Sequence, residues 1–478
     1  MRYSVFLLGL LFVLGVRCAP PAELPESSRA EPPENIIVFL VDDLGWTDLS
    51  GYGSDLYETP HIDRLAQEGI KFTQAYSACT VCSPTRAALL TGKYPARLHL
   101  TDWIAGHTNE FGKLRVPDWT KYLPSREVTL GELAQEVGYA SASIGKWHLG
   151  NDSSYYPQYQ GFDVNVAGYK RGQPPRYFYP YLNAETHDTL PYLRGGQPGE
   201  YLTDRLTQEA CQFIRKHHRQ PFFLYFPHYA VHTPIQAKDS LTAYYQQKLK
   251  PGLQHFNPKY AAMVHSTDAS MGRLMQLLDS LSLSDHTTII FTSDNGGLSF
   301  RGRVTNNAPL RAGKGSAYEG GVRVPMIIKR PLSPLKGVVS DEPVITMDVF
   351  ATVADLLLPS SPHHDGVSLR EVIQDTASVL DREALFWHYP HYHPGGARPY
   401  SAIRQGNFRL IEFLEDQRLE LYDLEDDTGE TTNLVEELPE IAAELYHRLS
   451  AWRDEVNAQM PTVNPNYDSV QSQEFYSF

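Results

Sequence analysis

Cysteine is scarce in this sequence, with four in 478 residues, and one of the four, Cys18, lies just after the apolar run at the N-terminus. A chain with so few cysteines is not a disulfide scaffold, and at this length a hydrophobic core can stabilise it instead. Long apolar runs are also missing: the run at residues 5–16 is too short to span a membrane, and no later segment reaches that length. The sequence therefore argues against stable membrane insertion.

Positive charge is also in short supply, since 42 lysines and arginines stand against 56 aspartates and glutamates, and the formal net charge is −14. This balance argues against a nucleic-acid partner. An anionic substrate must then be attracted by a local positive site and not by the surface as a whole. The hydrophobic content of 42% is ordinary for a globular protein and is sufficient for one large domain and a smaller one.

The N-terminus has the features of an export signal. In residues 1–18 a basic residue precedes the apolar run, and cleavage can follow Cys18. We therefore expect a periplasmic or extracellular protein. A lipoprotein anchored at Cys18 is the weaker alternative, because Arg17 stands where a small residue is expected. Residues 19–34 are rich in proline and glutamate and are expected to form a disordered linker.

Buried-strand patterns alternate with helical patterns through most of the chain. The predicted strands are 36–41, 139–144, 221–226, 287–292 and 324–329, and the predicted helices are 60–68, 82–92, 129–138, 202–216 and 260–281. This alternation predicts an α/β domain with a doubly wound sheet flanked by helices over residues 35–365. Four short strands (384–389, 400–404, 408–413 and 419–424) and a helix at 437–457 predict a smaller antiparallel subdomain over 366–478.

Polar residues gather just past the C-terminal ends of the predicted strands. They are Asp42, Asp43, Lys146, His148, His232, Asp294 and Asn295. Open α/β sheets carry their active sites along this edge, so loops far apart in sequence are expected to meet in one crevice. Three carboxylates and an amide oxygen without paired histidines suit calcium, and suit magnesium less well. Taken singly, an Asp-Asp pair after a strand is more often a turn or a helix cap.

The segment from Cys82 to Lys93 predicts the start of a helix. Ser83 can cap its first turn, Pro84 suits the first helical position, and Gly92 can close the far end. A helix N-terminus attracts anions, and Arg86 lies one turn further on. The pattern indicates chemistry on a tetrahedral anion. Another interpretation is a reactive thiol or a redox pair, because Cys79 and Cys82 form a Cys-x-x-Cys sequence.

The run Cys-Ser-Pro-Thr-Arg from Cys82, followed by Leu-Leu-Thr-Gly-Lys ending at Lys93, resembles the signature of the type I sulfatases. These enzymes belong to the alkaline-phosphatase-like superfamily and include arylsulfatases and N-acetylgalactosamine sulfatases. The resemblance implies that a formylglycine-generating or an anaerobic sulfatase-maturating enzyme oxidises Cys82 to Cα-formylglycine (3-oxoalanine). If Cys82 stays free for this reaction, a bridge between Cys79 and Cys211 is allowed but not indicated.

The resemblance also implies a metal site and a set of roles. It matches Asp42, Asp43, Asp294 and Asn295 to the ligands of one calcium ion, with the oxygen formed at Cys82 completing the sphere. The implied catalytic set is Cys82, Arg86, Lys146, His148, His232, Asp294 and Lys314.

In our hypothesis the side chains of this set divide the proton transfers and the charge. Asp294 acts as base for the attacking hydroxyl, and His232 with Lys314 protonates the leaving oxygen. His148 accepts the proton of the elimination step. Arg86, Lys146, Lys314 and the calcium ion neutralise the equatorial oxygens of the transition state.

The substrate is less well indicated than the reaction. Trp103, His107 and the aromatic segment 387–398, which contains His391 and Arg398, are expected to bind a sugar, although this segment can also serve only to hold the subdomain to the core. A sulfated glycan of galactose or N-acetylgalactosamine type is favoured, and a general arylsulfatase is the alternative. A less favoured alternative is a phosphomonoesterase or phosphodiesterase of the same superfamily, which normally carries a serine or threonine nucleophile where this chain has Cys82.

A glycan-binding protein without activity is a further alternative. Such a protein would tolerate loss of Cys82, Lys146 or His232, and all three are present.

Overall fold

The structure is a computed structural model that describes residues 33–299, 304–331, 333–358, 360, 362–375 and 377–476. The predicted signal peptide and nearly all of the predicted linker at 19–34 lie outside the described residues, so both stay predictions. No helix in the described part of the chain is long and apolar enough to cross a membrane.

A nine-stranded sheet forms the core of the larger part, in the order β10-β2-β8-β7-β1-β6-β4-β5 with β9 paired to β2. Its strands are β1 Asn35–Val41, β2 Ile70–Tyr76, β4 Ala140–Ile144, β5 Val164–Val166, β6 Phe222–Pro227, β7 Thr287–Ser293, β8 Arg323–Lys329, β9 Val338–Ser340 and β10 Val344–Ile345. Each predicted strand is present within one residue of its predicted bounds, whereas β2, β5, β9 and β10 were not predicted. Because β8 runs antiparallel to both β7 and β2, the sheet is mixed.

The central strands of this sheet are parallel, and their ends are level. Strand β1 pairs in parallel with β6 and β7, and β4 pairs in parallel with β6. Every side chain of the apolar run in β1 is fully buried, as expected for a strand covered on both faces. The register places Val41 opposite Ser293 and Leu40 opposite Pro227, so these strands end along one edge of the sheet.

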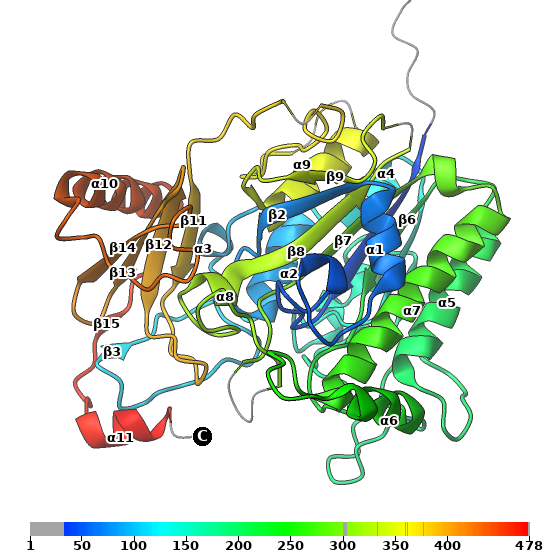
Figure 1. Cartoon of the computed structure of the whole chain (residues 1–478), viewed down its shortest axis with the longest axis horizontal. Helices are drawn as coiled ribbons and strands as arrows, with labels where there is room; N and C mark the ends of the chain where they lie inside the picture. Colours follow the sequence, from blue (N-terminus) through cyan, green and yellow to red (C-terminus); the bar gives the residue numbers. More distant parts are fainter. Residues whose placement is uncertain are drawn as a thin grey trace, which may run out of the picture. The chain divides into compact units, whose positions relative to one another are not determined.

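Helices flank the sheet in two groups (Figure 1). The first group packs on α7 and contains α1 Pro60–Gln67, α5 Leu202–His217, α6 Asp239–Lys248 and α7 Pro258–Ser280. The second contains α2 Cys82–Thr91, α4 Leu130–Glu136 and α9 Thr346–Leu357. A capping box formed by Thr129 and Glu132 begins α4, the helix predicted from residue 129. The fold class is therefore the predicted one, a large mixed α/β sheet with helices packed against it.

The smaller sheet is antiparallel, as predicted, and its strands lie in the order β11-β12-β13-β14. Its strands are β11 Leu385–Tyr389, β12 Tyr400–Gln405, β13 Phe408–Phe413 and β14 Arg418–Asp423, and helix α10 Pro439–Glu455 packs on β12 and β13. The short elements are α3 Pro95–Leu98, α8 Glu319–Val322 and α11 Ser469–Glu474, together with the strand pair β3 Leu114–Arg115 and β15 Thr462–Val463. The domain boundary at residue 365 stays a prediction.

The start of α2 differs from the prediction. The helix begins at Cys82 itself, with Val81 as its N-cap and without a side-chain cap. Ser83 does not cap the helix, because its hydroxyl donates to the carbonyl of His148 at 2.9 Å and accepts from the backbone N–H of Ile104 at 3.1 Å. The helix ends as predicted at Gly92, which has a left-handed φ of 70°.

Candidate active site

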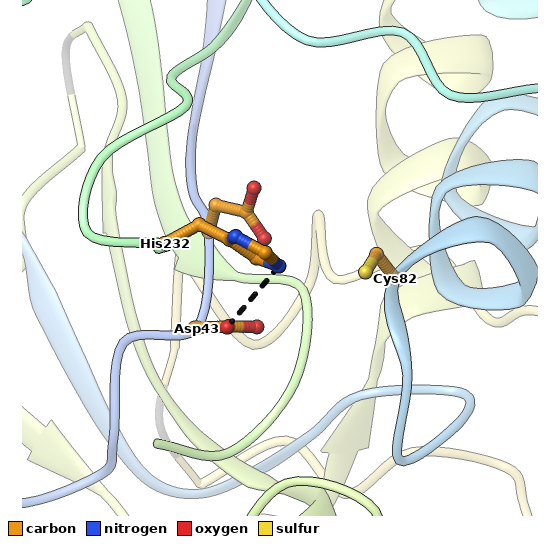
Figure 2. A group of neighbouring side chains, drawn as sticks. Asp43, Cys82 and His232 are labelled. Atoms are coloured by element: carbon orange, nitrogen blue, oxygen red, sulfur yellow. Dashed lines mark ion pairs between the residues drawn. The ribbon is translucent and has the colours of Figure 1, made fainter. Parts of the chain in front are cut away.

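The residues predicted to meet at the sheet edge do meet there. Asp42 and Asp43 follow β1, Lys146 follows β4, His232 lies beyond β6, and Asp294 follows β7. The backbone N–H of Asp42 donates to the carbonyl of Ala230 at 2.9 Å, and that of Asp294 donates to the carbonyl of Val41 at 3.1 Å. Figure 2 shows the thiol of Cys82, at the start of its helix, directed toward Asp43 and His232.

Each of the three buried carboxylates has a buried cation beside it. Lys146 Nζ lies 2.7 Å from Asp42 Oδ2, and Lys314 Nζ lies 2.6 Å from Asp43 Oδ1. Arg86 holds the third carboxylate, with Nε at 2.9 Å and Nη2 at 2.8 Å from Asp294 Oδ2. Buried charges are tolerated when they are paired in this way, and removing one member leaves the other uncompensated.

Burial and the neighbouring charges shift the pKa values of Asp42 and Asp43 in opposite directions. Burial and the nearby Asp294 raise the pKa of Asp42 well above its usual value. Burial is the largest single influence on Asp43 and acts to raise its pKa, but the charges of Lys314, His232 and Lys146 together outweigh it and hold this pKa below the usual range. Asp43 and Lys314 are therefore a charged pair at neutral pH.

The pKa values of the cysteines near the site are raised, whereas a reactive thiol has a lowered pKa. Burial raises the pKa of Cys82 above its ordinary value, although the charges of Lys146 and Lys314 lower it. Burial raises the pKa of Cys79 further, and Cys79, Cys82 and Cys211 are all free. A low-pKa thiolate and a bridge from Cys79 to Cys211 are therefore not what the fold presents.

Oxygen atoms in this cluster fit a hard cation. Asp42 Oδ1, Asp43 Oδ2 and Asn295 Oδ1 are buried and have no hydrogen-bond partner in the described part of the chain. Ligand atoms of Asp42, Asp43, Cys82 and His232 lie within 4.8 Å of one another. Buried carboxylate and amide oxygens without donors are the kind of group that calcium binds. Both oxygens of Asp294 already accept hydrogen bonds, one from Arg86 and one from the backbone N–H of Asp43.

Two histidines complete the cluster, and the structure fixes where His148 carries its hydrogen. His148 Nε2 contacts the carbonyl oxygen of Ile104. A carbonyl only accepts, so the hydrogen is on Nε2 and Nδ1 keeps its lone pair. Nδ1 has no hydrogen-bond partner among the described residues. Burial lowers the pKa of His148 well below its usual value and that of His232 to about 3, so both are neutral here. His232 Nε2 lies 3.6 Å from Asp43 Oδ2.

The cluster opens into a cavity of about 680 Å³. Asp43, Cys82, His148, His232 and Lys314 line its inner end, and Trp103, His107, His393 and the loop 169–175 line its walls. Arg86, Lys146 and Asp294 are fully buried and do not line it.

Two of the four residues predicted to bind the substrate line the cavity. Trp103 and His107 line the cavity as predicted, but the structure does not bring His391 or Arg398 to it. His391 is buried against Thr101 Oγ1 at 2.8 Å, and Arg398 pairs with Glu415 at 3.2 Å. His393, which was not singled out, is the histidine of that segment that reaches the cavity.

Comparison with known proteins decides which family this site belongs to. Residues 34–359, more than half of the chain, match the family model described as Sulfatase. The chain belongs to the sulfatase family. Residues 313–455 also match the family model described as N-sulphoglucosamine sulphohydrolase, C-terminal. The prediction from the Cys82 signature is thus confirmed, and the protein is a sulfatase enzyme.

Individual relatives cover most of this sulfatase. A protein named Sulfatase from Formosa agariphila is 34% identical over 91% of this chain and 91% of its own length. Human N-acetylgalactosamine-6-sulfatase is 34% identical over 76% of this chain and 69% of its own length. Among solved structures, Ps i-CgsB in complex with k-i-k-neocarrahexaose has a TM-score of 0.74 and 27% identity, covering 94% of this chain and 98% of that one.

Gly172 allows a prediction about His148. A Cβ atom at residue 172 would lie 2.4 Å from His148 Cε1, so the bare backbone supports the ring. We expect Gly172→Ala to displace the imidazole and to lower the kcat of the sulfatase by about 10- to 100-fold. Steady-state kinetics check this, with Gly429→Ala as control because its nearest contact is at 3.3 Å. Equal activity of the two variants would contradict a role for the ring position.

Proposed function

We propose that this sulfatase removes sulfate from a sulfated carbohydrate of galactose or N-acetylgalactosamine type, with a formylglycine made from Cys82 and one calcium ion. The observation that carries the proposal is the position of Lys314, whose Nζ lies 2.6 Å from Asp43 Oδ1 and 3.8 Å from Cys82 Sγ at the inner end of the cavity. An anionic ester bound at this end of the cavity would lie next to a cation and to residue 82, and the buried carboxylates beside them could hold a metal ion. The similarity to N-acetylgalactosamine-6-sulfatase and to a structure holding a neocarrahexaose supports a sugar substrate.

The chain's own residues support this chemistry in distinct ways. An aldehyde hydrate at position 82 would supply two hydroxyls, one to displace the alcohol from sulfur and one to release the sulfate. Arg86 and the backbone N–H of Asp43 hold Asp294 as an oriented acceptor for a hydroxyl proton. His148 Nδ1, with its lone pair, is suited to accept the proton of the release step. Lys314 and His232 line the cavity where the leaving oxygen would lie.

A calcium ion would be held by oxygens of Asp42, Asp43 and Asn295, with Asp294 and residue 82 beside them, and would offset negative charge there. Arg86 and Lys146 contribute to the same site indirectly, because they neutralise Asp294 and Asp42 and do not line the cavity. We also propose that residues 1–18 are a signal peptide, that the protein is exported, and that a maturating enzyme acts on Cys82.

Substrate turnover tests the proposed function. The full chain, produced with a maturating enzyme, is assayed for sulfate release from sulfated galactose and N-acetylgalactosamine, from an aryl sulfate, and for phosphate release from the matching phosphate esters. We expect sulfate release from at least one of the sugars to be faster than any phosphate release. Turnover of the aryl sulfate alone would favour a general arylsulfatase, and faster phosphate release would overturn the proposal.

Metal removal is expected to inactivate the enzyme reversibly. Dialysis against EGTA should lower kcat about tenfold or more, and added calcium should restore it, because three buried oxygens have no hydrogen-bond donor among the residues that the structure describes. In Asp42→Asn the calcium concentration needed for recovery should rise, since one carboxylate charge is lost. Full activity in a preparation shown to contain no bound metal would contradict this prediction.

A further inference from the structure

Ile104, in the loop after α3, connects the helix that carries Cys82 to His148. The backbone N–H of Ile104 donates to Ser83 Oγ at 3.1 Å, and its carbonyl oxygen accepts from His148 Nε2. Ser83 Oγ in turn donates to the carbonyl of His148 at 2.9 Å. These three hydrogen bonds join three segments beside residue 82. The orientation of the His148 ring therefore depends on where the loop places Ile104.

A buried carboxylate fixes the backbone on both sides of Ile104. Asp102 is fully buried, and its Oδ1 accepts from the backbone N–H of Trp103 at 2.9 Å. Its Oδ2 accepts from the backbone N–H of His107 at 3.3 Å. The indole of Trp103 lies beside the ring of His148, with 6.2 Å between the ring centroids. The loop 102–107 is thus closed by one side chain and lies against His148.

The small sheet holds the same carboxylate from the other side. The hydroxyl of Tyr389, a buried residue of β11, donates to Asp102 Oδ1 at 2.8 Å. Next to it, Thr101 Oγ1 lies 2.8 Å from Nε2 of His391, which follows β11. Burial raises the pKa of Asp102 to about 7, and its three hydrogen-bond donors act against this shift. Neutral donors from two distant parts of the chain therefore hold the carboxylate and fix the loop to β11.

We propose that Asp102 is a positioning residue for the sulfatase reaction, which fixes the loop 102–107 so that the Ile104 carbonyl keeps the His148 ring in one orientation and one tautomer. Asp102 does not line the cavity, so its effect on catalysis passes through His148. This inference rests on the proposed function and deepens it, because His148 Nδ1 is the group proposed to accept the proton when sulfate is released.

Asp102→Asn tests this role with almost no change in side-chain size. Its amide nitrogen would face one of the three donors, so a hydrogen bond is replaced by a repulsive contact between two donors. Tyr389→Phe removes one donor and is the milder variant. The matched control is Asp268→Asn. Asp268 is also buried with a pKa raised to about 7, and it accepts from the backbone N–H groups of His61 and Ile62 at the start of α1, but it does not line the cavity.

The first measurement uses the full chain before maturation, in which residue 82 is still a cysteine. NMR of protein containing isotope-labelled histidine distinguishes the two neutral tautomers, and the His148→Ala variant identifies the signals of His148. We expect the tautomer with its hydrogen on Nε2 in the wild type and in Asp268→Asn. Asp102→Asn should give a mixture of both tautomers, because the Ile104 carbonyl no longer stays in place.

The second measurement follows an aryl sulfate on the matured enzyme by rapid mixing. Release of the phenol in the first turnover does not require the proton acceptor His148, whereas release of sulfate does. We expect Asp102→Asn to leave the rate constant of the first phenol release within about twofold and to lower the steady-state rate about tenfold. Asp268→Asn should change neither. In the His148→Ala background, Asp102→Asn should cause no further loss, because the two residues act as one unit.

Unchanged His148 signals in Asp102→Asn would overturn the proposal. A loss of equal size with and without His148, or equal slowing of phenol and sulfate release, would also overturn it, because each would indicate a general structural role. If Asp102→Asn does not fold, Tyr389→Phe decides by the same criteria, with an expected steady-state loss of about threefold. A matured wild-type enzyme that releases no sulfate would overturn the proposed function, whereas the NMR signals of the unmatured chain would still decide whether Asp102 positions the ring.

Discussion

Cys82→Ser and Cys82→Ala are expected to fold normally and to release no more than a trace of sulfate. A methyl group in place of the thiol cannot be converted to the aldehyde, and a serine hydroxyl lacks the thiol that the maturating enzyme is expected to oxidise. Loss of a covalent nucleophile costs on the order of 10⁴-fold or more in kcat. The fold should survive, because Cys82 is small and its replacements fit the same space. A Tm within about 3 °C of the wild type would be consistent with this.

The control for this prediction is Cys211→Ser. Cys211 is a buried free cysteine in α5 and does not line the cavity, so its loss should leave kcat close to that of the wild type. Assays of sulfate release and thermal melting on the three variants decide the matter. Full turnover by Cys82→Ala, or by Cys82→Ser in which mass spectrometry shows residue 82 to be an unoxidised hydroxyl, would refute the mechanism, because the aldehyde would then not be needed.

Lys314→Met is expected to lower kcat by about 10²- to 10³-fold, the usual cost of removing one well-placed group that stabilises charge in the transition state. Among the three cations paired with the carboxylate cluster, Lys314 lines the cavity, whereas Arg86 and Lys146 do not. A sulfate next to residue 82 would therefore contact Lys314 directly. The loss should appear mainly in kcat if the ammonium group acts more strongly on the transition state than on the bound ester.

The same substitution should also lower the Tm, because Asp43 would keep its buried charge without the partner at 2.6 Å. Lys336→Met, at an exposed position, is the matched control and should change neither quantity. Steady-state kinetics and thermal melting separate the two effects. A kcat within about threefold of the wild type would mean that Lys314 only balances the charge of Asp43.

The large sheet was predictable because buried parallel strands are continuous apolar runs, as in β1 and β6. Strand β2 escaped prediction because polar residues interrupt its pattern, and several of them are partly exposed. The start of α2 was misplaced because Ser83 has a cap-forming side chain that the fold uses to join α2 to the loops of Ile104 and His148. A local pattern does not reveal such a tertiary partner.

The site divides in the same way. Asp42, Asp43 and Asp294 could be placed together because they end neighbouring parallel strands, and this follows from the strand pattern alone. Arg86 binds the carboxylate of Asp294 and does not line the cavity. This could not be predicted, because the two residues are far apart in the chain. The selection of His393 instead of His391 depends on Gly315, which lies in a different part of the sequence and whose missing side chain makes the space.

Mass spectrometry of the peptide that contains Cys82, taken from the enzyme preparation used for the activity assay, tests the central claim most directly. Conversion of the cysteine to formylglycine exchanges sulfur and two hydrogens for one oxygen and lowers the mass by about 18 Da. The account predicts this lighter peptide, in a fraction that rises in proportion to sulfate release across preparations made with different amounts of maturating enzyme. Full sulfatase activity in a preparation whose Cys82 is entirely an unmodified thiol would contradict it.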